Sequence, residues 1–330
     1  MRFCPLDGTE LPQARTTSST TIARRITREE PRVELPSAGQ DPLIGQVLEG
    51  KYHIQSRIGQ GATGAIYRAE RINIGDAVAV KVLKPEFAED YAASERFRRE
   101  ALALGRIRHP NVIAIYDYFE QPRQGDRPAS IFLVMELLSG KTLRDLLRQE
   151  HVLDIRRTIR LMVQICAALH VAHERNVIHR DLKPENIMVE QYDRQQEMAK
   201  VIDFGLARLR MTGKLIKTLT EQGRVAGTPY YMAPEQWMDR PLDARTDVYA
   251  LGIICYEMLT GRVPFNADTV MQLANKHVKL PPQPPIELRR ELPPGVSQAI
   301  LRALAKQPQE RPSTTLELAD ALQRGLLGAA

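Results

Sequence analysis

Hydrophobic and polar positions alternate in short runs from Lys51 onward, and many of the apolar positions hold β-branched residues. Runs with a period of two predict strands that bury one face. The expected strands are residues 52–59, 65–71, 77–83, 112–119 and 130–137, with a helical segment near 94–106 between the third and fourth. This half of the chain therefore predicts a small sheet with one helix.

Beyond Gly140 the apolar positions recur every three to four residues, which predicts helices. The clearest segments are residues 143–149, 158–175 and 248–261, and the proline-rich residues 281–285 predict a surface loop. A sheet-rich part followed by a larger helical part is typical of an α+β fold. We expect two lobes, about 46–137 and 138–330, with a hinge near 135–140.

The chain before these segments lacks either period. Residues 11–42 are crowded with Thr, Ser, Arg, Pro and Gln, so they cannot bury a face, and we expect residues 1–45 to be a flexible tail. The first residues resemble one knuckle of a zinc ribbon, but Asp7 stands where a second Cys beside Cys4 is needed. A single Cys without a neighbouring ligand cannot hold a structural zinc ion, which favours a degenerate ribbon or a plain turn.

Composition and charge are those of a globular protein, with 43% apolar and 26% charged residues in 330. The net charge of +6 invites a nucleic-acid interpretation. Residues 1–50, however, hold six Arg against seven Asp and Glu, so the excess forms no basic tail. We expect a mildly basic surface and no nucleic-acid partner.

Cysteine usage and hydropathy indicate the compartment. Cys4, Cys166 and Cys255 are too far apart in the sequence to suggest a disulfide framework, which agrees with a reducing environment. We find no apolar run of transmembrane length and no signal-peptide pattern. The expectation is a cytoplasmic protein with no membrane segment in this chain.

A glycine-rich run, Gly59-Gln60-Gly61-Ala62-Thr63-Gly64, lies between two predicted strands. A dinucleotide-binding fingerprint would open a helix at this point, whereas flanking strands predict a hairpin whose backbone N–H groups can close over phosphates. On this run alone, a plain glycine-rich hairpin remains an equal alternative.

Lys81 and Glu100 both fall on faces that are otherwise apolar. The strand period places Lys81 with Ala79 and Leu83, and the helix period places Glu100 with residues 97, 101 and 104. A buried ammonium needs an anionic partner. We therefore predict a Lys81–Glu100 ion pair that holds Lys81 against phosphates; an ordinary surface charge at Glu100 is the alternative.

The segment His179-Arg180-Asp181-Leu182-Lys183-Pro184-Glu185-Asn186 is followed by two short predicted strands and then by Asp203-Phe204-Gly205. In an antiparallel hairpin the residue that enters the first strand lies beside the residue that leaves the second. Asn186 and Asp203 should therefore converge. A carboxylate and an amide oxygen side by side are ligands that suit Mg²⁺.

These motifs together resemble the protein-kinase family, in particular bacterial-type (Hanks-type) serine/threonine kinases. The resemblance covers about residues 51–324 and includes the glycine loop, AVAVK, the helix Glu, HRDLKPEN, DFG, APE and TDVYALG, in family order and at family-like spacing. It implies a bilobal fold and transfer of the γ-phosphoryl group of ATP, with Mg²⁺ or Mn²⁺, to protein hydroxyls.

The resemblance also implies roles for single residues. Asp181 would orient the substrate hydroxyl and accept its proton, Lys183 would steady the γ-phosphate, and Asn186 and Asp203 would hold the metal. Lys81, with Glu100, would meet the α and β phosphates. Residues implied around ATP are Ile58, Gly59, Gly61, Gly64, Ile66, Ala79, Met135 as gatekeeper, Met188, and the backbones of Glu136 and Leu138. Ile66 replaces the Val found in many members and keeps the apolar contact.

Substrate class and regulation follow from the same resemblance. Lys183 together with Thr228 resembles serine/threonine rather than tyrosine kinases, because that threonine would bridge Asp181 and Lys183. Arg180 would receive a phosphate placed on Thr218 or Thr220 by autophosphorylation. Arg311 is expected to pair with Glu235, and Asp247 to bind the HRD backbone.

Expected partners are protein substrates and a second copy of the chain, acting in trans as a dimer. Two other function classes stay open: a kinase-shaped scaffold without activity, which the intact catalytic positions oppose, and a small-molecule phosphotransferase, which the APE segment and Thr228 oppose. A zinc site at Cys166, His170 and His173 fits their helical spacing, but a core-facing stripe fits it equally well and is favoured.

Overall fold

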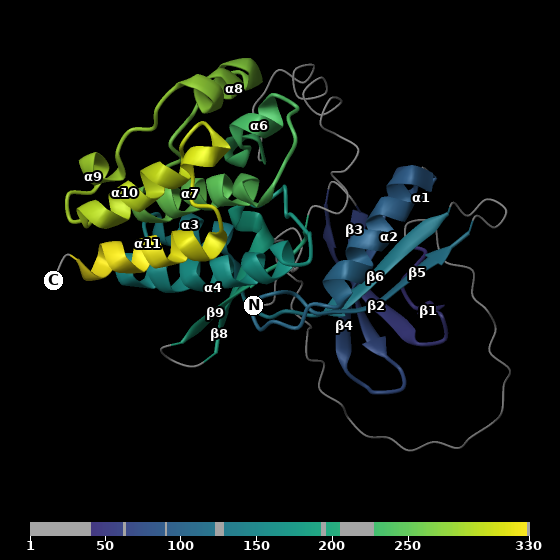
Figure 1. Ribbon diagram of the computed structural model, residues 1–330. Coiled ribbons are helices and arrows are strands. Elements are labelled where there is room, and N and C mark those ends of the chain that lie inside the picture. The colour runs from purple at the N-terminus through teal and green to yellow at the C-terminus, as the bar shows by residue number, and fades with distance from the viewer. Residues whose placement is uncertain are drawn as a thin grey trace, which may run out of the picture.

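The computed structural model describes residues 41–61, 64–89, 91–122, 129–192, 196–204 and 228–328. These residues form a sheet with two helices on one side of the molecule and a larger, mainly helical part on the other (Figure 1). Residues 1–40 of the predicted tail, with its ribbon-like start, lie outside the described residues. Residues 41–45, which were also placed in the tail, form a turn in which the Gly45 N–H donates to the Ile54 carbonyl at 2.8 Å. The boundary at residue 45 stays a prediction. None of the described helices combines the length and the apolar character needed to cross a bilayer.

The smaller part is a six-stranded sheet with the strand order β1-β2-β3-β4-β6-β5. Its strands are β1 (Val47–Leu48), β2 (Tyr52–Gln60), β3 (Gly64–Arg71), β4 (Ala77–Leu83), β5 (Ile115–Gln121) and β6 (Ser130–Glu136). The predicted alternation on β4 is confirmed, since Val78 and Val80 pack in one apolar cluster and Ala79 and Leu83 in another. Lys81 shares the face of Ala79 and Leu83.

The helix that crosses this sheet is α2 (Tyr91–Gly105), preceded by the short α1 (Pro85–Ala88). Phe97, Ala101 and Leu104 are buried, as the 3.6-residue period predicts. Glu100 lies on the same stripe, one turn from Phe97 and from Leu104. The helix therefore directs a carboxylate toward the interior side of the sheet.

The fourth strand begins later than predicted. β5 starts at Ile115, whereas Val112 forms a parallel bridge to Val201 in the helical part, and the Ile113 N–H donates to the Val201 carbonyl at 3.1 Å. The apolar run of residues 112–119 is continuous, but its first residues satisfy their backbone groups against β9 instead of the larger sheet. These residues tie the two parts of the fold together.

A second sheet carries the predicted polar convergence. It consists of β7 (Lys141–Thr142), β8 (Ile187–Gln191) and β9 (Glu197–Val201), in that order. β8 and β9 are antiparallel, with Ile187 opposite Val201. The Ile202 N–H donates to the Asn186 carbonyl at 3.0 Å, so the residues before β8 and after β9 lie side by side at one end of the hairpin.

Helices make up the rest of the larger part. They are α3 (Leu143–Glu150), α4 (Ile155–His173), α6 (Pro234–Trp237), α7 (Ala244–Thr260), α8 (Val270–Lys279), α9 (Pro285–Leu288), α10 (Pro294–Ala303) and α11 (Thr315–Leu327). Thr142 and Asp154 cap α3 and α4 with side-chain oxygens, each accepting from the backbone N–H three residues on. The expected helices are thus confirmed, with end points shifted by a few residues.

The centre of this part is α7, which is buried along nearly all of its length. It ends at Gly261, whose φ of +75° is the left-handed conformation that glycine adopts readily. α4 and α10 pack against α7, and α11 packs on α10 and α4. Residues that flank α7 and α4 are consequently held on a rigid base, and the predicted catalytic segment lies among them.

Candidate active site

The segment after α4, residues 174–186, holds most of the predicted catalytic positions. Its backbone is fastened to α7, because the Asp247 carboxylate accepts from the His179 N–H at 2.8 Å and from the Arg180 N–H at 3.0 Å. Asp247 is 1% exposed. The expectation that Asp247 binds this backbone is confirmed.

His173 completes the surroundings of Asp247, with its Nε2 at 2.7 Å from the carboxylate. Burial alone would raise the pKa of the Asp247 carboxyl, but the hydrogen bonds and the charges of the nearby histidines lower it. His173 was one of the three residues considered for a zinc site, with Cys166 and His170, and in the structure it contacts Asp247. Cys166 faces the core, and its carbonyl accepts from the Thr315 hydroxyl at 2.7 Å.

Asp181, Lys183 and Asn186 form a compact group within this segment. The Lys183 Nζ lies 3.2 Å from the Asp181 Oδ2, and the Asn186 Nδ2 donates to the Asp181 carbonyl at 2.8 Å. The second contact uses the amide nitrogen of Asn186 and leaves its amide oxygen for another partner. The chain therefore places a carboxylate, an ammonium and an amide oxygen within one short loop.

Asp203 lies two residues after β9, and its φ of +49° is in the left-handed region. Its Oδ1 accepts from the Lys81 Nζ at 2.6 Å, and the Lys81 side chain is only 5% exposed. The sheet and the helical part thus meet through an ion pair between two predicted site residues.

The predicted ion pair of Lys81 with Glu100 is wrong for this structure. Glu100 instead binds the Arg180 Nη1 at 2.8 Å, and Lys81 binds Asp203. The sequence pattern placed both Lys81 and Glu100 on inward faces correctly, but inward faces also receive charges from the other lobe. Arg180 and Asp203 both reach this space from the larger lobe. Glu100 therefore pairs with Arg180, and Lys81 pairs with Asp203.

The apolar residues predicted around adenine are brought together. Each is at most 4% exposed, and all belong to one cluster that extends through both parts of the fold. They are Ile58, Ile66, Ala79, Met135, Leu138 and Met188. Met135 lies opposite Ala79 on the neighbouring strand. Contact of these residues with a purine stays a prediction.

Glu136, at the end of β6, forms hydrogen bonds with Ala114 and Lys200 through its backbone and its side chain. Its N–H donates to the Ala114 carbonyl at 3.0 Å, and its carboxylate accepts from the Ala114 N–H at 2.7 Å and from the Lys200 Nζ at 2.5 Å. The side chain thus connects the end of β6 with the residue before β5 and with β9, a role that the sequence did not indicate.

The strands that flank the glycine-rich run, β2 and β3, pair in antiparallel fashion as predicted, and the Gly61 N–H donates to the Gly64 carbonyl at 2.8 Å. A Cβ on Gly64 would lie 2.0 Å from the Val82 carbonyl oxygen, so the packing of β3 on β4 already requires glycine there. Gly59 lies opposite Ile66 in the strand pairing. Phosphate binding by this hairpin stays a prediction.

The segment 228–237 packs beside residues 174–186, which we call the catalytic loop. Its Glu235 forms the expected buried pair with Arg311, through two hydrogen bonds of 2.8 Å each. The Thr228 side chain, Thr218 and Thr220 lie outside the described residues, and their proposed roles stay predictions.

A scan against protein-family models finds the protein kinase domain over residues 52–323. The chain belongs to the protein kinase family. The serine/threonine-protein kinase pkn3 of Myxococcus xanthus is 39% identical over 276 residues, which cover 83% of this chain and 50% of that protein. The serine/threonine-protein kinase PknB of Mycolicibacterium smegmatis is 37% identical, over 83% of this chain and 42% of that protein.

A solved structure with the same architecture is the kinase domain of Mycobacterium tuberculosis PknI. Its TM-score is 0.67 at 24% identity, and the match covers 86% of this chain and 99% of that domain. This likeness concerns the fold. The kinase described here spans about half or less of the length of the two relatives named above.

A polar network that the sequence did not indicate lies beside the catalytic loop. Arg144 binds Glu185 and Glu257 at 2.8 Å each and also contacts the Tyr231 hydroxyl, which donates to Glu257 at 2.5 Å. Glu185 belongs to the HRDLKPEN segment, while the other three come from α3, α7 and the turn after Thr228. No periodic pattern links them, because the network exists only once four separate segments have packed.

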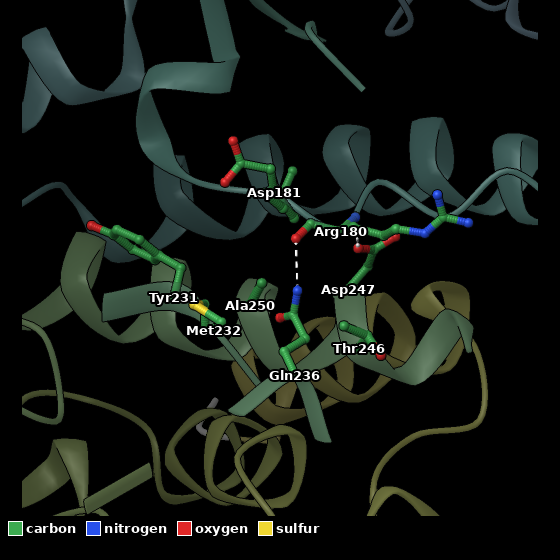
Figure 2. A pocket seen from close by; sticks show the side chains of 9 residues that line it. Arg180, Asp181, Tyr231, Met232, Gln236, Thr246, Asp247 and Ala250 are labelled. Carbon is green, nitrogen blue, oxygen red and sulfur yellow. Dashed lines mark hydrogen bonds between the residues drawn. The ribbon is translucent and has the colours of Figure 1, made fainter. Parts of the chain in front are cut away.

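Gln236 was also missed. It lies on α6, directly after APE, and its side chain reaches the catalytic loop of the kinase, as Figure 2 shows. The residues around this contact come from the loop, α6 and α7 and leave no room for a water molecule between them. Its position next to a family motif was the only sequence signal available.

Proposed function

We propose that this kinase transfers the γ-phosphoryl group of Mg-ATP to serine and threonine hydroxyls of proteins. The observation that carries the proposal is a pair of neighbouring groups: Lys81 binds Asp203, and both Lys183 and Asn186 contact Asp181. The hydrogen bond from the Ile202 N–H to the Asn186 carbonyl links the two groups. In-line phosphoryl transfer needs mainly positioning and neutralisation of phosphate charge. Two ammonium groups and a pair of metal-ligand oxygens match that requirement.

Asp203 and Asn186 fit a magnesium site because they offer one carboxylate and one amide oxygen at the same end of a hairpin. Mg²⁺ is commonly held by one or two carboxylates together with substrate phosphates. When bound, the ion would neutralise charge on the phosphate oxygens. Within the described residues no group of three or more His, Cys, Asp or Glu side chains competes as a metal site.

The reaction would proceed with Asp181 next to the acceptor hydroxyl. The bond from the hydroxyl oxygen to the γ-phosphorus forms, the bond to the leaving oxygen of ADP breaks, and the Asp181 carboxylate takes the hydroxyl proton. Lys183 would face the γ-phosphate that is transferred. Lys81 would face the α and β phosphates. Ile58, Ile66, Ala79, Met135, Leu138 and Met188 would enclose the adenine.

Regulation by autophosphorylation belongs to the same proposal. Arg180, which pairs with Glu100, would exchange this partner for a phosphate on Thr218 or Thr220, added by a second copy of the chain in trans. Replacing both threonines by Ala should then lower the transfer rate of enzyme that has been incubated with ATP. If the wild type and the double variant, both incubated with ATP, transfer phosphate at equal rates, this regulation is refuted.

The acceptor class is tested with labelled ATP and a panel of acceptors: a serine/threonine-rich protein, a tyrosine peptide and small-molecule alcohols and sugars. We expect label on serine and threonine only, and no label in any acceptor with Asp181→Asn. Transfer to small molecules in preference to protein would support the phosphotransferase alternative, and no transfer at all would support a scaffold.

A further inference from the structure

Gln236 connects the peptide-side segment of the fold with the catalytic loop. Its Oε1 accepts from the Ala233 N–H at 2.9 Å, and its Nε2 donates to the Arg180 carbonyl at 2.8 Å. The residue is 7% exposed. Figure 2 shows the side chain reaching up to the Arg180 carbonyl while the Asp181 carboxylate points away from it. One amide group therefore bridges α6 and the residue before Asp181.

The residue that Gln236 holds has a constrained backbone. Arg180 has a φ of +63°, a conformation that costs a non-glycine residue on the order of 1 kcal/mol or more and persists only where the surroundings fix it. The Arg180 N–H is fixed by Asp247 at 3.0 Å, and its carbonyl is fixed by Gln236. These two contacts fix the two peptide planes that flank the Arg180 Cα, and the plane held by Gln236 is the one that leads into Asp181.

Two further hydrogen bonds restrain the backbone of Asp181 itself. The Asp181 N–H donates to the His179 carbonyl at 2.8 Å, and the Asp181 carbonyl accepts from Asn186. Among these hydrogen bonds to the loop, only the one from Gln236 comes from the segment 228–237. Gln236 is thus placed to transmit the position of that segment to the carboxylate of Asp181.

We propose that Gln236 is a positioning residue for phosphoryl transfer, which orients Asp181 by holding the Arg180 carbonyl. The inference rests on the proposed kinase activity. The donor group of Gln236 is the essential part, because an apolar side chain of the same size fills the same space but leaves the buried carbonyl without its hydrogen bond. Nucleotide binding should not depend on Gln236, since the predicted nucleotide residues lie on the sheet, the hinge and β8.

Two substitutions separate the two hydrogen bonds. Gln236→Glu keeps an oxygen for the Ala233 N–H but loses the donor to Arg180, whereas Gln236→Met loses both. Gln323→Glu, on the exposed surface of α11, is a matched control for the added charge. We expect kcat for a protein acceptor to fall about tenfold or more in both Gln236 variants, since small displacements of a catalytic group reduce rates strongly. The KM for ATP should stay within about twofold.

The pH dependence distinguishes positioning from a purely structural role. A buried glutamic acid has a raised pKa, and its neutral form can donate a proton to the Arg180 carbonyl as the glutamine does. The kcat of Gln236→Glu relative to that of the wild type should therefore rise as the pH is lowered from 8 to 6. Gln236→Met, with no titratable group, should show no such recovery.

Hydrogen exchange of the amides in residues 179–186 provides a readout that does not need activity, and we expect it to be faster in both variants. Wild-type kcat in Gln236→Glu at pH 8, or unchanged exchange in Gln236→Met, would overturn the proposal. A wild-type enzyme that transfers no phosphate would refute the proposed function instead, and the exchange measurement would still decide whether Gln236 holds the loop.

Discussion

Arg311 offers a stability test whose size follows directly from its contacts. All five N–H groups of its guanidinium are hydrogen-bonded: two to the Glu235 carboxylate at 2.8 Å each and three to backbone carbonyls at 2.8–3.1 Å. Its side chain is 0% exposed, and that of Glu235 is 4% exposed. Arg311→Met would leave a buried carboxylate whose remaining partner is the Thr246 hydroxyl at 2.9 Å.

Removing one member of a buried ion pair lowers the free energy of unfolding by about 3–5 kcal/mol, because the other charge stays buried without compensation. We expect a loss of that size for Arg311→Met. The double variant Glu235→Gln, Arg311→Met should lose less, since no charge is then left in the core. Urea unfolding followed by the fluorescence of Trp237, the only tryptophan, reports on this region directly.

The control is an exposed pair with the same chemistry. Arg302 and Glu317 are 2.8 Å apart, with side chains 52% and 32% exposed, so Arg302→Met should change the free energy of unfolding by no more than about 1 kcal/mol. If Arg311→Met and Arg302→Met have equal effects, burial is not what makes the Glu235 pair important, and the reasoning fails.

Two further predictions concern packing and pH. Gly325→Ala should destabilise the protein by about 1–3 kcal/mol in thermal denaturation, because the added Cβ would lie 2.5 Å from the Gly295 backbone. Gly105→Ala is the control. It has open space around the added Cβ and should be neutral or stabilising in the same measurement. Burial and the Lys306 charge lower the pKa of His277 in the folded protein to about 3. As the pH falls below 7, His277 is therefore protonated in the unfolded chain before it is protonated in the folded protein, which favours unfolding. The wild type should therefore lose about 2 kcal/mol of stability between pH 7 and pH 5 that His277→Gln does not lose, measured by urea unfolding at both pH values.

Most of the fold followed from local patterns, and the reasons are visible in particular residues. The alternation on β4 and the helical stripe of Phe97, Ala101 and Leu104 predicted their buried faces correctly, because burial of one face determines both periods. The predicted pairing of β8 with β9 is confirmed, and it places the residues before and after the hairpin side by side, since the Ile202 N–H donates to the Asn186 carbonyl. The fourth strand was placed too early because residues 112 and 113 pair with β9, a choice that local hydropathy does not encode.

The site was less predictable where charges meet across segments. The partners of Lys81 and Glu100 could not be assigned from their faces alone, since Asp203 and Arg180 reach the same space from the other lobe. Gln236 carries no period and no unusual neighbour. Its role depends on a carbonyl 56 residues earlier in the chain, and only the packed structure shows the contact.

The most direct test of the account is the effect of Mg²⁺ on ATP affinity, measured by calorimetry for the wild type and for Asp203→Asn. If Asp203 and Asn186 hold the ion against the phosphates, Mg²⁺ should tighten ATP binding by the wild type at least about tenfold, a change worth 1.4 kcal/mol. Asp203→Asn should bind ATP equally well with and without Mg²⁺. A variant in which Mg²⁺ still tightens ATP binding as strongly as in the wild type would contradict the proposed site.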